Sequence, residues 1–146
     1  MYITHPAHEV EKLSRTAHTT WTLTDVDFTK GPMQDANTTD TTLNPGQSAV
    51  GTGIALVASA TTGINGGSGF LATDVGRFVF LTAGYAKITG VTDTTNAVIT
   101  IITALTNADA TANWQLGAFS DTTGHPSCVT FFEQRCLLYT SPSPRD

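Results

Sequence analysis

Residues 78–103 read FVFLTAGYAKITGVTDTTNAVITIIT and contain three apolar runs separated by short polar turns. The runs FVFL, YAKITGV and AVITIIT are rich in β-branched and aromatic residues, which favour strands over helices. The polar segment TDTTN between the last two runs is typical of a turn. The stretch therefore predicts consecutive short strands of an antiparallel sheet.

Further runs of the same kind flank this stretch. GIALVASA (residues 53–60) precedes it, the segment 70–81 offers Val75, Phe78 and Phe80 as apolar positions, and NWQLGAF (113–119) follows it. About five short strands at regular spacing, with turn signals between them, predict a small antiparallel β-barrel over residues 48–119. Only the connection 104–113, ALTNADATAN, has a composition that could hold a helical turn.

Composition supports an all-β class. Charged residues make up 13% of the chain and hydrophobic residues 40%, and Thr, Ala, Gly and Asn are abundant. The net charge of −5 and the scattered basic residues argue against a nucleic-acid interface. No apolar run approaches the roughly 18 residues of a membrane helix, and no signal peptide is recognisable at the N-terminus.

The first 32 residues predict three short strands, at residues 1–5, 10–15 and 21–28. In the third strand Trp21 and Leu23 alternate with polar residues. A three-stranded piece of this size is not stable by itself, so we expect it to pack on a partner that the rest of this chain need not supply. Residues 33–47, MQDANTTDTTLNPGQ, are polar and aperiodic and predict a loop or linker.

Residues 120–135 predict the start of another sheet. The polar turn SDTTGHPS leads into CVTFFEQR, which reads as the first strand of a following element, truncated at its end. Residues 136–146, CLLYTSPSPRD, differ in character because Ser-Pro repeats cannot extend a strand. We expect this tail to stay outside the fold.

The four histidines do not form a metal pattern. His5, His8, His18 and His125 lack the spacing and the preformed backbone that a three- or four-ligand site needs. We therefore expect no bound metal, and interpret these histidines as solvated residues at strand ends.

Candidate catalytic groups are equally sparse. His125 and Cys128 are three residues apart on an extended segment and point to opposite faces, which excludes a simple nucleophile–base pair. Asp25 and Asp27 read as solvated carboxylates, and an enzyme acting on cell-wall polymers would require them to converge with Glu133. The loop GINGGSGF precedes a strand and has no Lys, unlike a phosphate-binding loop. We expect no enzymatic activity and no cofactor.

Three motifs occur in a fixed order along the chain. HPAHEVEKLSRTAHTTWTLTDVDFTKGP (5–32) combines His-Pro, K-L-x-R, W-x-L and G-P; DVGRFVFL (74–81) continues through KITGV to W-x-LGAFS; and GHPSCVTFFEQR (124–135) comes last. In this order they resemble segments of the nozzle or hub proteins of short-tailed bacteriophage tails and their prophage relatives. The resemblance implies an all-β fold, in which a small antiparallel β-barrel is inserted between partial propeller-like β-blade segments.

The blade segments implied by this resemblance are residues 1–32 and the truncated strand 120–135. The tail CLLYTSPSPRD resembles the translation of a transposase adapter used to build sequencing libraries. We therefore expect residues 136–146 to be foreign and the chain to be an internal, metagenomic fragment of a longer protein.

The resemblance also implies a function. It predicts a non-catalytic structural component of a phage or prophage tail, located in the virion and, during assembly, in the host cytoplasm. Its partners would be other tail subunits, in a homo-oligomeric ring of the full-length protein, with no specific nucleic-acid binding and no membrane. The alternative is a carbohydrate- or protein-binding module that recognises the host surface, for which Tyr85 and Trp114 are the candidate interaction residues.

Overall fold

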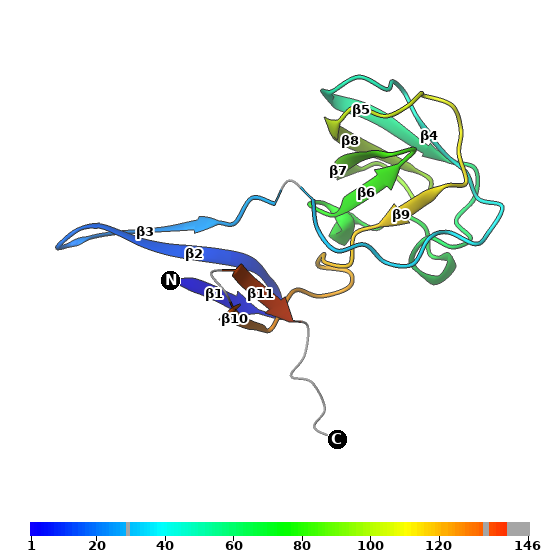
Figure 1. Cartoon of the computed structure of the whole chain (residues 1–146). Helices are drawn as coiled ribbons and strands as arrows, with labels where there is room; N and C mark the ends of the chain where they lie inside the picture. Colours follow the sequence, from blue (N-terminus) through cyan, green and yellow to red (C-terminus); the bar gives the residue numbers. More distant parts are fainter. Residues whose placement is uncertain (29, 133–134, 140–146) are drawn as a thin grey trace. The chain divides into compact units, whose positions relative to one another are not determined.

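A computed structural model of the 146-residue chain describes residues 1–28, 30–132 and 135–139. The prediction of an all-β chain is confirmed, because the described residues form eleven strands and two single-turn 3-10 helices. The chain divides into two compact units (Figure 1). One is formed by Thr29–Thr122, and the other by Met1–Phe28 together with the residues from Thr123 onward.

The unit Thr29–Thr122 is built on a six-stranded antiparallel sheet of order β4-β5-β8-β7-β6-β9. Figure 1 shows this sheet strongly curled, and we call the unit the half-barrel. The first of its strands, β4, pairs with β5 and is also bridged to Thr111, just before β9. The strands are β4 Leu43–Pro45, β5 Gly51–Ala58, β6 Phe78–Leu81, β7 Gly84–Val91, β8 Asn96–Thr103 and β9 Trp114–Leu116.

The core of the half-barrel lies on the inner face of this sheet. Ile99 of β8 is fully buried and stands directly between Ile54 of β5 and Ile88 of β7. Each buried aliphatic side chain of this size contributes about 1.5–3 kcal/mol through removal from water. The buried apolar cluster comprises Leu43, Ile54, Leu56, Ala58, Ile64, Phe70, Val79, Leu81, Ala86, Ile88, Ala97, Ile99, Ile101, Leu105, Trp114 and Leu116.

The apolar face of β6 differs from the one that the aromatic residues indicated. Val79 and Leu81 are fully buried in the core, whereas Phe80 is half-buried on the outer face of the sheet. Phe78 shares the outer face with Phe80, and its ring lies 3.6 Å from the position that a Cβ on Gly31 would take. Val75 is exposed, before the strand begins. The aliphatic residues of β6 therefore fill the curled interior, and its aromatic residues cover the outside.

Residues 33–47 were expected to be a linker or loop, and most of them do form a loop, but they do not link two parts of the chain. This segment belongs to the half-barrel, contributes strand β4, and runs along β9 through a bridge between Met33 and Gly117. Leu43 anchors the segment in the core, and the amide of Asn37 orders its polar part. Its Nδ2 donates to the carbonyls of Thr39, Thr41 and Ala112 at 2.9–3.1 Å. Polar, aperiodic sequence can thus be ordered by hydrogen bonds to backbone groups.

The two 3-10 helices do not lie in residues 104–113, where the sequence predicted that a helical turn could form. They span Asn65–Gly67 and Ala72–Asp74, in the connection between β5 and β6, whereas residues 104–113 contain no helix. Within the described part of the chain, no helix has the length and apolarity needed to cross a membrane.

The second unit contains the three predicted N-terminal strands, which are confirmed. They are β1 Tyr2–His5, β2 His8–Ala17 and β3 Thr20–Asp25, in an antiparallel sheet of order β1-β2-β3. Strand β10, Cys128–Phe132, lies beside β1, where the rings of Tyr2 and Phe131 are 5.7 Å apart. The two ends of the chain, expected to begin successive blades, therefore meet in one compact unit.

The expectation that residues 136–146 stay outside the fold is wrong for the first four of them. Strand β11, Arg135–Tyr139, pairs antiparallel with β10, with Cys128 opposite Tyr139 and Thr130 opposite Leu137. The run of Cys, Leu, Leu and Tyr has strand-forming composition up to the first polar residues of the tail. Residues 140–146 lie outside the described part, and the adapter origin of the tail stays a prediction.

Candidate functional site

The two predicted interaction residues do not form one surface patch. Trp114 is only 3% exposed and its indole Nε1 donates to the carbonyl of Thr41 at 2.9 Å, so it is a core residue and its prediction as an interaction residue is wrong. Tyr85 is half-buried and packs edge-on against Phe80, with ring centroids 5.3 Å apart. Register places Trp114 with Leu81 on the inner face and Tyr85 with Phe80 on the outer face.

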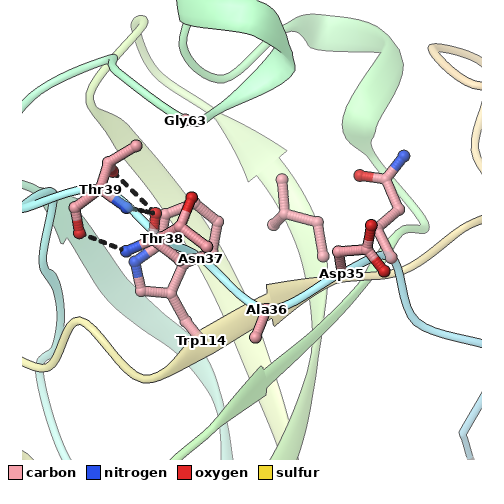
Figure 2. Close-up of a pocket in the computed structure, with 9 residues that line it drawn as sticks. Asp35, Ala36, Asn37, Thr38, Thr39, Gly63 and Trp114 are labelled. Atoms are coloured by element: carbon pink, nitrogen blue, oxygen red, sulfur yellow. Dashed lines mark hydrogen bonds between the residues drawn. The ribbon is translucent and has the colours of Figure 1, made fainter.

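A small polar pocket lies above Trp114. It has a volume of about 120 Å³ and is lined by Gln34, Asp35, Ala36, Asn37, Thr38, Thr39, Gly63, Trp114 and Leu116 (Figure 2). Sites for small organic ligands usually measure about 300–1,000 Å³, so this depression is too small for one.

The polar atoms of the pocket are also used within the protein. Asn37 Oδ1 accepts hydrogen bonds from the backbone N–H and the hydroxyl of Thr39, at 3.0 and 2.7 Å, as the dashed lines in Figure 2 show. Gly63 has a φ of +84°, and a Cβ there would lie 2.9 Å from Thr39 Oγ1. The residues around the pocket therefore form a hydrogen-bonded turn that orders the segment before β4.

A buried ion pair lies at the start of β6. Arg77 Nη1 and Asp74 Oδ1 are 2.9 Å apart, and both side chains are almost completely removed from solvent. Burial lowers the pKa of Arg77, while the charge of Asp74 and its hydrogen bond oppose this effect. Buried charges of this kind are tolerated only when their remaining hydrogen-bonding atoms are also satisfied.

The guanidinium of Arg77 connects segments that are distant in the sequence. Its Nε donates to the carbonyl of Gly117 at 2.7 Å, Nη1 to Asn65 Oδ1 at 2.7 Å, and Nη2 to Gln34 Oε1 at 2.8 Å. The first residues of the half-barrel, the β5–β6 connection and the exit from β9 are thereby tied to one cation.

The carboxylate of Asp74 is satisfied equally well. Its Oδ2 accepts from Asn65 Nδ2 at 2.6 Å and from the backbone N–H of Leu71 at 2.9 Å, and its Oδ1 accepts from Thr122 Oγ1 at 2.7 Å. Every oxygen of the pair is engaged and the group is closed to solvent. We therefore assign this network a structural role in holding the half-barrel together.

The histidines are distributed over separate turns. His5 and His8 stack at the β1–β2 turn with ring centroids 5.2 Å apart, and His5 Nδ1 accepts from the N–H of Ala7. His18 Nδ1 lies 2.6 Å from an Arg15 nitrogen. His125 is buried and its backbone N–H donates to the carbonyl of Pro6, so its interpretation as a solvated residue is wrong. Within residues 1–28, 30–132 and 135–139, no three His, Cys, Asp or Glu side chains come together as metal ligands would.

The candidate carboxylates and the candidate thiol within the described part of the chain do not line a common cleft. Asp25 and Asp27 are exposed, and Glu133 lies outside the described residues. Cys128 is half-buried at the start of β10, with its Sγ 3.8 Å from the hydroxyl of Ser127.

Exposed apolar side chains gather on one side of the β1–β3 sheet. Trp21 is 57% exposed, Leu23 52% and Ile3 37%, although all three belong to paired strands. The opposite side of the sheet carries the buried Val10 and the ring of Tyr2. We call the uncovered side the Trp21 face. It consists of Met1, Ile3, Glu11, Leu13, Arg15, Trp21, Leu23 and Asp25.

Sequence reasoning anticipated that this sheet would need a partner, but it did not identify the face. The signal was available in the alternation of residues 21–25, which places Trp21, Leu23 and Asp25 on one side.

Neither a family model nor a curated protein matches the chain.

Proposed function

We propose that this chain is part of a non-catalytic structural subunit of a bacteriophage or prophage tail, of the nozzle or hub type. Its work is assembly, through contacts with other tail subunits in a homo-oligomeric ring of the full-length protein. It would act in the virion, and in the host cytoplasm while the particle is built.

The observation that carries this proposal is the Trp21 face. Soluble proteins cover a paired, apolar strand face unless another surface binds there. Strand β3 is exposed along its whole length, and its Trp and Leu side chains are half or more accessible. An assembly subunit, which is complete only beside its neighbours, accounts for such a face.

The chain order of the two units also supports the proposal. The half-barrel lies between residues 28 and 123, while the segments before and after it combine in the other unit. The three sequence motifs imply a barrel inserted between segments of two blades, and the inserted position of the half-barrel supports that part of the resemblance. The buried Arg77–Asp74 network would keep such an insertion rigid during assembly.

No specific observation favours the alternative of a host-surface binding module. Trp114 is in the core, Tyr85 lies on the other face of the sheet, and the pocket between residues 34 and 39 is small. We therefore propose the assembly role and not the host-binding role.

The direct test is to locate the protein in particles. Virus-like particles purified from the source of the sequence should yield peptides from residues 1–135 by mass spectrometry. Antibodies against the 146-residue chain should label their tails in electron micrographs. Recovery of these peptides only from the soluble, particle-free fraction would contradict the proposed function.

A further inference from the structure

The Trp21 face carries its charges at opposite ends of an apolar centre. Across β2 and β3, the directly opposed residues are Glu11 with Asp25, Leu13 with Leu23, and Arg15 with Trp21. Along the strands the face therefore consists of an acidic pair, an apolar pair, and a cation beside an aromatic ring. Ile3, opposite Glu11, and Met1, opposite Leu13, extend the apolar part along the first strand, and the α-ammonium of Met1 donates to the Leu13 carbonyl at 2.8 Å.

The acidic pair has no cation of its own. Like charges directly opposite each other on neighbouring strands are unfavourable. Within the described ranges, neither Glu11 nor Asp25 takes part in an ion pair. Arg15 is four residues further along β2, about 13 Å away at the rise of a strand, and cannot reach Glu11. The acidic end is thus complementary to a cation from outside the sheet.

The cation at the other end is held in position. Arg15 Nε donates to the carbonyl of Ala17 at 3.1 Å, and Nη2 lies 2.6 Å from His18 Nδ1. Its guanidinium carbon is 5.5 Å from the centre of the Trp21 ring. Arg15 is nevertheless exposed, so a fixed positive charge faces outward at a defined distance from the acidic pair.

We propose that the Trp21 face binds the same face of a second copy of this chain, with a two-fold axis running across the strands at Leu13 and Leu23. This rotation reverses the strand direction, so Arg15 of each copy meets Glu11 of the other. The apolar pairs stack at the centre, and Trp21 approaches Asp25 of the second copy.

Charge order distinguishes this arrangement from the other two-fold packing of the same faces. An axis parallel to the strands would place the acidic pair of one copy on the acidic pair of the other, and Arg15 of one copy on Trp21 of the other. Four carboxylates would then repel one another in place of two. Sheets that pack face to face lie about 10 Å apart, a distance that an Arg and a Glu reaching from opposite sides can span. The face is therefore self-complementary in one orientation, as a two-fold interface requires.

The inference rests on the proposed assembly function, since it names the partner of the face that carries it. A two-fold contact joins copies in pairs, so in the full-length protein it would join two rings rather than close one. The apolar centre is small, so we expect a weak dimer, and its exposed charge pairs make the dimer sensitive to salt.

The first experiment is sedimentation velocity on the full chain over a range of concentrations, at low and at high salt. The wild-type chain should shift from monomer to dimer as concentration rises, and the shift should need more protein at high salt. Leu23→Lys should weaken the dimer about tenfold or more, because it places a charge in the apolar centre. Thr22→Lys, one residue away on the opposite side of β3, is the matched control and should leave the dimer unchanged.

The second experiment exchanges the charges. Arg15→Glu alone and Glu11→Arg alone should each weaken the dimer, since each places like charges against each other. An equimolar mixture of the two variants should restore dimers, and so should the double variant R15E/E11R. Circular dichroism of each variant shows whether the sheet is folded.

Three results would overturn the inference: a wild-type chain that stays monomeric at every concentration, a dimer indifferent to Leu23→Lys, or single-charge variants that the mixture does not rescue. These results are separable from a failure of the proposed function. Particles that contain the protein while the pure chain is monomeric would contradict only the two-fold partner. A dimer of a protein absent from particles would contradict only the tail assignment.

Discussion

Strands β8 and β3 have similar alternating sequences but very different surroundings. In β8, NAVITIIT, Ala97, Ile99 and Ile101 are at most 3% exposed. In β3, TWTLTD, every residue is exposed, including Trp21 and Leu23. Strand β8 is paired on both edges and covered by the curled half-barrel, whereas β3 is an edge strand that is open on both faces. Alternation thus predicts a strand and its apolar side, but not whether anything covers that side.

The largest expected effect comes from comparing two arginines, one buried in the half-barrel and one exposed on the β1–β3 sheet. Arg77→Ala should destabilise the half-barrel by about 3–5 kcal/mol, because it leaves the buried Asp74 without its cation. Arg15→Ala, on the exposed face of β2, should change stability by no more than about 0.5 kcal/mol. Urea unfolding followed by circular dichroism measures both changes.

The two tryptophans allow the two units to be followed separately. The chain has two Trp residues, and Trp21 is exposed in one unit while Trp114 is buried in the other. In a Trp21→Phe background, fluorescence reports the half-barrel alone. If Arg77→Ala unfolds at the same urea concentration as its parent in that background, the network contributes nothing to the half-barrel.

The second prediction compares the apolar residues of the same two strands. Ile99→Ala should cost about 2–5 kcal/mol, since it opens a cavity in the centre of the core. Leu23→Ala should cost about 0.5 kcal/mol or less in the monomer, because the side chain is already half in water. Unfolding at protein concentrations below the dimer range gives both values. A large loss for Leu23→Ala in the monomer would show that the Trp21 face is covered within the chain.

Much of the fold could be predicted because its determinants are local. Strands β1–β3 and β5–β9 follow runs of β-branched and aromatic residues bounded by turn residues, and the sequence shows these directly. Strand β4 was missed because Leu43–Pro45 is only three residues long and lies in a polar segment. Its order comes from Asn37 and from the bridge to Thr111, which no local pattern reveals.

The internal network could not be predicted for a similar reason. Asp74 and Arg77 are three residues apart, but Gln34 and Gly117, which complete the hydrogen bonds of Arg77, are about 40 residues away on either side. The Trp21 face was easier to predict from the sequence, since its apolar and charged residues alternate within β2 and β3. That nothing covers this face depends on tertiary structure, which no local pattern reveals.

The third prediction concerns close packing around the glycine-rich loop. A Cβ on Gly69 would lie 2.2 Å from the carbonyl oxygen of Thr94, which accepts a hydrogen bond from Phe70 N–H. Gly69→Ala should therefore cost about 2–3 kcal/mol, from the clash and from its φ of +78°. Gly66 has a similar φ of +66° but open space around it, so Gly66→Ala should cost only about 1 kcal/mol. Equal losses would show that conformation alone decides both positions.

The smallest expected effect is a gain in stability at the β6–β7 turn. Thr82 and Ala83 connect the paired residues Leu81 and Gly84 with φ values of +39° and +73°, a conformation in which Asn-Gly is preferred. These positive φ values are strained for Thr and Ala. The half-barrel maintains the strain because the hydroxyl of Thr106 donates a hydrogen bond to the carbonyl of Thr82 at 2.6 Å and holds the turn. Ala83→Gly should stabilise the unit by up to about 1 kcal/mol, measured as a higher urea midpoint in the Trp21→Phe background.

The matched control for this turn is the same chemical change three residues later. Ala86 is fully buried in β7 with extended backbone, so Ala86→Gly should destabilise the half-barrel by about 1 kcal/mol through lost packing and a more flexible unfolded chain. Opposite signs for the two substitutions would show that the core imposes the left-handed turn at a local cost. A loss at both positions would mean that Ala83 contributes packing that outweighs its strain, and that the turn is as well fitted to its sequence as the strands beside it.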